Sequence, residues 1–336
     1  RSSDLIIVLL INLITTPTFF RITINNGVLY GYIIDVINRA SELVVLAVGM
    51  TLVVSASAGT DISVGAVMAV AAAVCTRVLA GGEVSVNEYA NPYVLAVLAA
   101  LAAAVVCGGF NGFLVAKLKI QPMVATLILF TAGRGISQLV TNGQITYIRV
   151  DGYKLLGNNI PGIPIPTPIF VAVIVVVLTY ILLKKTAMGM YIQSVGINER
   201  ASRLVGLKSV KIIWMAYAFC GLCAGIAGLV ASSRIYSADA NNIGLNMELD
   251  AIAAVALGGN SLGGGRFSLL GSVIGAYTIQ ALTTTLYAMS VPADQIPVYK
   301  AIVVILIVAV QSEELKKFRK RLASRHSSKN VEGGVA

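Results

Sequence analysis

The chain has 336 residues, of which 57% are hydrophobic and only 12% are charged, whereas a soluble domain carries about 25% charged residues. This composition excludes an ordinary soluble domain and predicts a protein that crosses a membrane several times. The formal net charge is +10, but the basic residues gather in short loops and in the C-terminal tail. That placement is typical of orientation signals and lipid contacts, and it argues against nucleic-acid binding.

Apolar runs long enough for membrane helices recur along the whole chain. The eighth run is too short for a full span and is predicted to be broken or tilted. The first is interpreted as what remains of a spanning helix, because no small-residue cleavage site follows it. In chain order the runs cover residues 4–20, 42–59, 63–80, 92–116, 121–140, 167–183, 212–232, 248–259, 267–288 and 298–311.

These runs predict an all-α polytopic membrane protein with about ten transmembrane helices. The transmembrane domain covers residues 1–311, and a basic cytoplasmic tail covers residues 312–336. Residues 42–140 and 212–311 each contain four crossings and begin on opposite sides of the membrane. The chain is therefore a candidate for an inverted repeat, as found in many transporters.

The distribution of Lys and Arg predicts the orientation, because short cytoplasmic loops are rich in these residues. The loop 81–91 contains glutamates but no Lys or Arg, and it is predicted to lie outside. An even number of crossings places both termini in the cytoplasm. The basic residues predicted to share that side with the tail are Lys117, Lys119, those of the loop 184–211, and Arg266.

Small residues predict close helix packing. The segments GGFNG (108–112), GLCAG (221–225) and GSVIG (271–275) each place two glycines four residues apart, on one helical face. For GGFNG, a role in lining a path stays open because Asn111 lies within it. The CxxC of Cys220 and Cys223 lacks the further ligands of a zinc site, so all four cysteines are interpreted as packed side chains. The sequence predicts no metal site.

The segment SVGINERASRLVGLKSVKIIW (194–214) is unusually charged for this chain. Gly196 is predicted to break the chain, Asn198 to cap a short helix, and Gly206 to end it. Glu199 stands in the first turn, where the helix dipole favours an anion. Ile197, Ala201, Leu204, Val205 and Lys208 form a narrow stripe along the helix. The segment is either a solvated surface helix or a docking element for a cytoplasmic partner.

The absence of a nucleotide-binding motif from the sequence favours the interpretation of this segment as a docking element. A transporter needs an energy source, yet the chain contains no GxxxxGK[ST] nucleotide loop. GGNSLGGGR (258–266) is rich in glycine but lacks the Lys-Ser/Thr ending. If ATP drives the protein, a separate subunit must bind the ATP and its magnesium. The residues assigned to this coupling role are Gly196, Asn198, Glu199, Arg200, Ala201, Arg203 and Gly206.

Polar and ionisable residues within apolar segments are candidates for a gate or pathway. Asp61 is expected either to cap the helix that begins at Ile62 or to act at a gate. Arg134 needs a carboxylate or several carbonyl groups as partners, and Asp61, Glu248 and Asp250 are all candidates. Glu248 and Asp250 are also interpreted as favourable anions at the start of the short eighth segment. The candidate gate or pathway residues are Asp61, Asn111, Arg134, Gln138, Tyr277 and Gln280.

Several motifs resemble one family of membrane proteins. SVGINERASRLVGL (194–207) is similar to the cytoplasmic coupling motif of ABC importer permeases for ribose, xylose and related sugars. GTDISVGAVMAV (59–70) and ELDAIAAVALGGNSLGGGRFSLLGSVIGA (248–276) resemble two further blocks of that family. KIQPMVATLILFTAGRGISQLV (119–140) and SADANNIGLNMELDAI (237–252) bring the chain closest to the galactofuranose permeases. Thr60, Ile62 and Ser202 depart from the family pattern.

The resemblance implies an ABC importer permease fold and a translocation subunit without catalytic residues or cofactors of its own. The implied partners are a second permease chain, an ABC ATPase that binds ATP and magnesium, and a periplasmic or lipid-anchored sugar-binding protein. The predicted cargo is a neutral monosaccharide, a pentose or a furanose-form hexose, crossing the bacterial inner membrane. The alternatives are an importer permease for branched-chain amino acids or nucleosides, and an ion-coupled secondary sugar carrier.

Overall fold

The computed structural model describes residues 5–6, 8–10, 17–25 and 28–311. The chain divides into two compact units between Thr284 and Thr285. The second unit contains the end of α12 (Leu269–Ala288) and α13 (Ile296–Gln311). The first unit holds the other helices described below and two small sheets. Eight of the 17 residues of the predicted run 4–20 fall outside the described residues, and the predicted tail 312–336 falls wholly outside them.

Each predicted apolar run after the first corresponds to a helix. The eighth is the short helix α11 (Met247–Leu257), which confirms that it is too short for a full span. Within the described residues, six helices are long and apolar enough to cross a membrane, while α3 and the apolar part of α13 are shorter. The other helices of the first unit that match predicted runs are α2 (Tyr32–Ser57), α3 (Val64–Ala80), α4 (Tyr93–Ala116), α5 (Pro122–Val140), α7 (Thr167–Lys185) and α10 (Ser209–Ile235).

The helix α2 begins ten residues before the apolar run that predicts it. Its first turns carry polar residues such as Asn38, which a hydropathy run excludes but a helix accepts. In the structure Arg234, near the end of α10, donates to the carbonyl oxygen of Asn38 at 3.2 Å. A partner on a neighbouring helix therefore supports a helical turn that hydropathy alone does not reveal.

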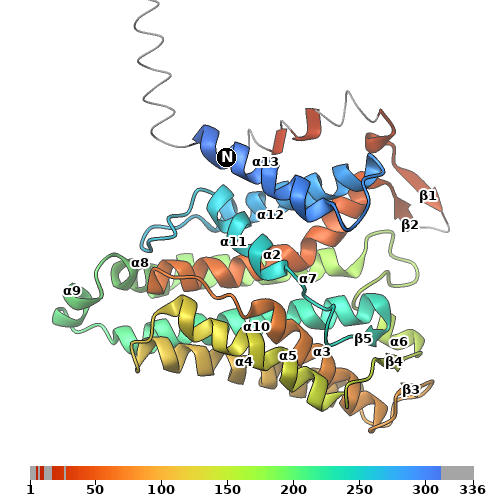
Figure 1. Ribbon diagram of the computed structural model, residues 1–336, viewed down its shortest axis with the longest axis horizontal. Coiled ribbons are helices and arrows are strands. Elements are labelled where there is room, and N and C mark those ends of the chain that lie inside the picture. Colours follow the sequence, from red (N-terminus) through yellow and green to blue (C-terminus); the bar gives the residue numbers. More distant parts are fainter. Residues whose placement is uncertain (1–4, 7, 11–16, 26–27, 312–336) are drawn as a thin grey trace, which may run out of the picture. The chain divides into compact units, whose positions relative to one another are not determined.

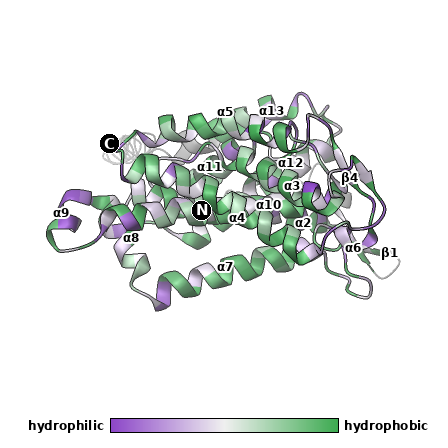
Figure 2. Cartoon of the chain, turned by 90° about the horizontal axis from the view of Figure 1, so that it is seen from below, coloured by the Kyte–Doolittle hydropathy of each residue, from purple (hydrophilic) through white to green (hydrophobic). Residues whose placement is uncertain are grey.

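The core of the first unit is built around α2 and α10, which pack against each other, and α10 also packs against α3 and α4. Nearly all side chains of α2 from Leu43 to Ala56 are buried. By contrast, α4, α5 and α7 bury only a minor part of their apolar surface. A helix that is apolar on all sides, such as α2, is expected to be surrounded by other helices. The outward apolar faces of α4, α5 and α7 are suited to contact with lipid. Figure 2 shows α7 hydrophobic along most of its length.

Glycine faces allow the closest helix contacts, as the sequence predicted. A Cβ atom on Gly108 of α4 would lie 2.4 Å from the carbonyl oxygen of Tyr217 and 2.9 Å from the Cα of Gly221 on α10. A Cβ on Gly275 of α12 would lie 2.0 Å from the carbonyl oxygen of Ala254 on α11. The two helices of each pair therefore touch through their backbones.

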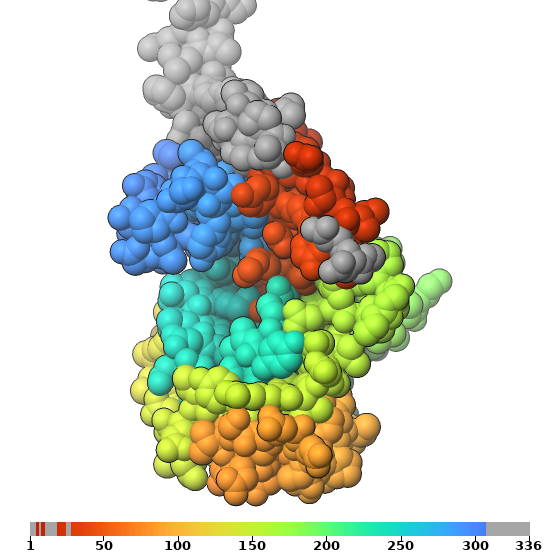
Figure 3. Space-filling model, turned by 90° about the vertical axis from the view of Figure 1, so that its right-hand side faces the viewer, coloured from red at the N-terminus to blue at the C-terminus, as the bar shows by residue number. Residues whose placement is uncertain are grey.

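The two ends of the first unit differ in structure. At one end lie α8 (Met188–Ile197) and α9 (Glu199–Leu204), and we call this the α9 end (Figure 1). The opposite end, the sheet end, carries β3 (Ser85–Val86), β4 (Thr146–Ile148), β5 (Ser237–Ala238) and α6 (Asp151–Lys154). Segments far apart in the sequence thus meet at the sheet end, as Figure 3 shows on that face.

The small sheets are short and tie loops together. β4 is the central strand of the order β3-β4-β5, parallel to β3 and antiparallel to β5. Strands β1 (Thr23–Asn25) and β2 (Val28–Tyr30) form an antiparallel hairpin that follows the 3-10 turn η1 (Pro17–Phe20). These strands hold the connections between helices and do not form a layer of the core.

Candidate coupling and translocation site

The charged segment forms two helices separated by a sharp break. Asn198 adopts an extended conformation, and its side-chain oxygen accepts a hydrogen bond from the backbone N–H of Ala201 at 3.0 Å. The predicted cap is thereby confirmed. Helix α9 ends at Leu204, and Gly206 follows with a left-handed φ of +87°, which an L side chain rarely adopts. The predicted stop at Gly206 is confirmed as well.

The predicted chain break at Gly196 is wrong, because Gly196 lies within α8. The requirement for glycine is steric. A Cβ at this position would lie 1.7 Å from the carbonyl oxygen of Ser55, in the last turn of α2, and 2.7 Å from the backbone nitrogen of Gly265. The N–H of Gly265 itself donates to the oxygen of Ser55 at 3.0 Å. The backbone at the end of α8 is therefore in direct contact with the backbone at the end of the central helix α2.

A cluster of charges holds α9 against the bundle. Glu199 accepts a hydrogen bond from Lys119, in the loop that follows α4, over 2.5 Å, and it also pairs with Arg203 one turn along α9. The hydroxyl of Ser209, at the start of α10, donates to the same carboxylate at 3.1 Å. This cluster joins α4, α9 and α10. It also confirms that Lys119 lies on the same side of the bundle as the loop 184–211.

The same cluster determines the ionisation of Glu199. Partial burial opposes ionisation, but the hydrogen bonds from Lys119 and Arg203 outweigh it and lower the pKa of the Glu199 carboxyl below its ordinary 4.5. A carboxyl whose pKa is lowered by folding stabilises the folded state above the unfolded pKa. That stabilisation is lost as the pH falls through the folded value.

We expect the attachment of α9 to be unchanged from neutral pH down to the ordinary carboxyl pKa of 4.5 and to weaken only below it. Hydrogen–deuterium exchange of the α9 amides, corrected for the intrinsic pH dependence of exchange, measures this attachment. Glu199→Gln should weaken protection at neutral pH and remove its acid dependence. An acid dependence that persists in Glu199→Gln would contradict the assignment to this carboxyl.

Three apolar side chains within and beside α9 are highly exposed. The side chains of Ile197, Leu204 and Val205 are 68%, 89% and 78% exposed, and Arg200 is exposed beside them. Figure 2 shows α9 as a mostly hydrophilic element that projects from its end of the unit. All five residues of the predicted stripe are thus exposed, Ala201 and Lys208 included, and the three apolar side chains named above form an exposed strip beside charged residues.

Asp61 and Asn111 meet inside the bundle. The Oδ1 atom of Asp61 accepts hydrogen bonds from the N–H and hydroxyl of Ser63, at 2.9 and 2.7 Å, and from Asn111 Nδ2 at 3.4 Å. Asn111 also donates to the Ser63 hydroxyl at 2.8 Å. Because Asn111 stands five residues before the end of α4, the cluster lies about 7 Å inside that end.

The predicted cap at Asp61 needs correction. Helix α3 begins at Val64, with Ser63 in the cap position, so no helix begins at Ile62. The Ile62 N–H instead donates to Thr126 Oγ1 of α5 at 3.2 Å. Asp61 orders the turn before α3 and links it to α4, because it accepts from both Ser63 and Asn111. The segment 58–63 is thus a connection held within the bundle.

Arg134 and Gln138 form a second polar group, between α5 and the segment before α11. Arg134 donates to the carbonyl oxygens of Ala240 and Ile243 at 3.0 and 2.6 Å, and Gln138 donates to Asn241 at 2.6 Å. Two carbonyl groups thus fulfil the requirement predicted for Arg134. Of the candidate carboxylates, Glu248 acts on Arg134 electrostatically, as does Asp239.

Two charged atoms of this group lack protein partners. Among the described residues, the second terminal nitrogen of Arg134 and Glu248 Oε2 are buried without a hydrogen-bond partner. Buried polar atoms are nearly always satisfied, so each exception needs an explanation. Glu248 and Asp250 do stand in the first turn of α11, as predicted. Both unpartnered atoms therefore keep unused hydrogen-bonding capacity.

The remaining pathway candidates lie on α12. Gln280 donates to Thr284 one turn further along the same helix, at 3.3 Å, and Tyr277 is half-buried. Other polar side chains bond to their own helix: Ser55 to the carbonyl oxygen of Thr51, and Thr283 to that of Ile279. Such bonds satisfy a hydroxyl within an apolar helix. Tyr277 and Gln280 share no described hydrogen bond with the Asp61 cluster.

One buried ion pair was not predicted from the sequence. Arg234 pairs with Glu42 at 3.1 Å, and both side chains are largely buried. They border a recess of about 290 Å³, which Asp239 and Asn242 also line. The sequence did indicate that such a pair exists, because a carboxylate such as Glu42, in the apolar run of one helix, needs a cation on another helix. Only the antiparallel packing of α2 and α10 reveals which cation this is.

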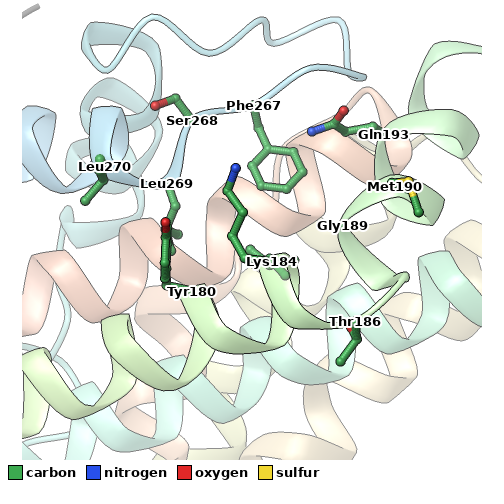
Figure 4. A pocket seen from close by; sticks show the side chains of 11 residues that line it. Tyr180, Lys184, Thr186, Gly189, Met190, Gln193, Phe267, Ser268, Leu269 and Leu270 are labelled. Carbon is green, nitrogen blue, oxygen red and sulfur yellow. The ribbon is translucent and has the colours of Figure 1, made fainter.

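A larger cavity lies at the α9 end. It measures about 480 Å³ and is bounded by the last two turns of α7, by α8, and by residues 267–270 at the start of α12. Figure 4 shows the amine of Lys184 extending from α7 toward Phe267, with Gln193 of α8 on the other side. The cavity has both apolar and polar walls.

The described residues show no metal centre. Among them, no group of three or more His, Cys, Asp and Glu side chains could hold a metal ion. Cys220 and Cys223 are buried free thiols that pack on Gly49 of α2. The arrangement as a whole combines a helical bundle with outward apolar faces, buried polar groups within it, and an exposed apolar strip beside charged residues at one end. This arrangement is typical of a membrane permease.

The comparisons place the protein within a known family. The chain belongs to the family described as branched-chain amino acid transport system / permease component, whose model matches residues 32–311. It is therefore a multi-pass protein of the inner membrane.

Individual relatives match over nearly the full length. The chain is 44% identical to the galactofuranose transporter permease protein YtfT of Escherichia coli (strain K12), over 96% of this chain and 91% of that protein. It is 39% identical to the fructose import permease protein FruF of Bifidobacterium longum (strain NCC 2705), over 93% and 86%. It is 35% identical to the ribose import permease protein RbsC of Escherichia coli (strain K12), over 94% of both chains. No solved structure matches significantly.

Proposed function

We propose that this chain is the translocation subunit of an ATP-driven ABC importer for a neutral monosaccharide, a pentose or a furanose-form hexose such as galactofuranose. The observation that carries the proposal is the full-length similarity to permeases named for galactofuranose, fructose and ribose. The family description names branched-chain amino acids, but these three relatives are named for sugars. Catalytic residues and cofactors are assigned to a partner ATPase that binds ATP and magnesium.

The ATPase docks on the exposed face of α9. Gly196, Asn198, Glu199, Ala201, Arg203 and Gly206 shape and hold the element, while Arg200 and the strip of Ile197, Leu204 and Val205 contact the partner. The fixed contact between Gly196 and Ser55 then transmits displacement of α9 to α2. Because α2 packs against α10, α7 and α11, movement of α2 can change the packing of the core.

The α9 end faces the cytoplasm, and both termini lie on that side. The basic residues Lys119, Arg203 and Lys184 gather at this end, as expected for the cytoplasmic side. A periplasmic or lipid-anchored binding protein delivers the sugar at the sheet end, and a second permease chain completes the pore. The transmembrane domain extends over residues 1–311, with the coupling loop 184–211 and a basic tail from 312 to 336.

An inverted repeat of four helices accounts for several paired features. Helices α2 and α10 each end in a left-handed residue, Ala58 and Tyr236, and each is followed by a short helix, α3 or α11. The contacts also pair, because α2 packs on α11 while α10 packs on α3. About ten crossings in total complete this arrangement.

The sugar path runs past the buried polar groups. Asp61 and Asn111 form a gate near the α9 end. Arg134, Gln138 and Glu248 offer hydrogen-bonding groups nearer the sheet end, and Tyr277 and Gln280 contribute from α12. The unpartnered atoms of Arg134 and Glu248 support this assignment, because sugar hydroxyls can both donate and accept hydrogen bonds.

The test is substrate-dependent ATP hydrolysis by the reconstituted complex of permease, ATPase and binding protein. We expect one or a few monosaccharides to raise the ATPase rate several-fold, with no response to leucine or adenosine. Stimulation by leucine or adenosine and by no sugar would overturn the sugar assignment and leave the permease assignment intact. Transport driven by an ion gradient without ATPase would overturn the ATP-driven mechanism.

A further inference from the structure

A cavity of about 360 Å³ lies between the end of α4 and the start of α10. Gly112, Phe113, Ala116 and Lys117 line it from α4, and Lys208, Val210, Lys211 and Trp214 line it from α10 and the residue before it. The site is separate from the α9 strip and from the polar groups of the proposed path. It is unusual in combining an apolar floor with three lysines.

Glycines on α4 make room for the indole that forms one wall. A Cβ on Gly109 would lie 3.3 Å from the ring atom Cζ2 of Trp214, and a Cβ on Gly112 would lie 3.1 Å from Cδ1. Trp214 nevertheless stays 42% exposed, so its ring is seated against α4 with one part turned outward. An indole in this position suits the boundary between hydrocarbon and water.

The three lysines carry charge that the protein does not balance. None of the ion pairs among the described residues includes Lys117, Lys208 or Lys211. Glu199, the nearby carboxylate, is already engaged by Lys119 and Arg203. The ammonium of Lys117 lies 5.5 Å from the ring centre of Phe113. The positive end of the α10 dipole adds to the attraction for an anion at the same place.

An apolar track leads away from the lysines. Phe113, Phe110 and Val106 are exposed on α4, and their spacing of three and four residues places them on one face of the helix. This face belongs to a helix that buries little of its apolar surface. A ligand held by the lysines would therefore meet several turns of apolar surface directed along the membrane.

We propose that the cavity binds an anionic phospholipid of the surrounding bilayer. Its phosphate lies among Lys117, Lys208 and Lys211, and an acyl chain follows Phe113, Phe110 and Val106. Basic pockets between membrane helices bind acidic lipid headgroups by this combination of charge and apolar contact. A free phosphate ion would use the lysines but not the apolar track, so the two halves of the site together specify a lipid.

Trp214 makes the proposal directly testable, because it is the single tryptophan of the chain. The full permease is placed in nanodiscs containing phosphatidylglycerol and phosphatidylcholine in equal amounts. Bromine, which quenches indole fluorescence on contact, is carried on the acyl chains of only one lipid at a time. We expect brominated phosphatidylglycerol to quench Trp214 with an apparent affinity at least about fivefold higher than that of brominated phosphatidylcholine.

Variants identify the groups responsible. Lys117→Gln/Lys208→Gln/Lys211→Gln should reduce the preference to near one, while Arg at the same three positions should retain it. Lys184→Gln/Lys185→Gln, which removes two exposed lysines at the end of α7, is the matched control and should keep the preference. Equal quenching by the two lipids in the unaltered chain would overturn the proposal, as would a preference that survives in the triple Gln variant. A shift of Trp214 emission by inorganic phosphate without preferential quenching would identify a free-anion site and overturn it too.

Discussion

Replacing Leu204 and Val205 together by aspartate is expected to reduce association of the ATPase with the permease by about 100-fold or more. Each side chain is almost wholly exposed in the isolated chain, and burial of such an apolar side chain in a partner groove stabilises a complex by about 1.5–3 kcal/mol. The introduced carboxylates would in addition be buried without partners. Since neither side chain contacts the bundle, the permease itself should fold and insert normally.

Copurification of the ATPase with tagged permease, together with a titration of the two components, measures this effect. Val84→Asp at the sheet end is the matched control, because it also places an acid at an exposed apolar position. Arg200→Glu tests the charged border of the strip without breaking the Glu199–Arg203 pair, and it should weaken association to a smaller degree. Full ATPase recovery with the double aspartate variant would defeat the docking assignment.

Sequence patterns predicted elements whose cause is local. Hydropathy located the helices after the first run because each must be apolar over its own length. Asn198 and Gly206 marked the ends of α9 because caps act within one helical turn. The start of α2 was placed too late, because its first ten residues include polar side chains such as Asn38, whose carbonyl oxygen accepts from Arg234 of the distant helix α10.

These sequence patterns could not predict which segments, far apart in the chain, come into contact. Gly196 was assigned a local break, whereas the structure requires glycine there because the Ser55 oxygen lies in the way. The Glu42–Arg234 pair and the three-lysine cavity exist only because α2 and α4 both pack against α10. Arg134 was correctly expected to need carbonyl groups, but only the fold identifies Ala240 and Ile243. The composition of a buried site can thus be predicted, while its pairing depends on the fold.

The contact between α4 and α10 leaves no room for a residue larger than glycine at Gly108 or Gly221. Gly108 and Gly221 face each other, and a Cβ on Gly221 would lie 2.4 Å from the carbonyl oxygen of Ala104 on α4. Carbonyl oxygens of a helix backbone cannot move aside as a flexible side chain can. Any larger residue at either glycine must therefore separate α4 from α10.

Gly108→Leu is accordingly expected to prevent accumulation of folded permease, and Gly108→Ala to lower its melting temperature by several degrees. Overpacking costs about 1–3 kcal/mol when the core can adjust, and here the obstacle is backbone. Gly275→Leu should behave like Gly108→Leu, because its Cβ would lie 2.0 Å from the Ala254 oxygen. Gly135→Ala is the control, since a Cβ at Gly135 meets no atom of the described chain within 4 Å. Size-exclusion profiles and thermal unfolding of the detergent-solubilised protein measure both effects. If Gly108→Leu yields a monodisperse permease with the melting temperature of the unaltered chain, α4 and α10 do not touch through these glycines.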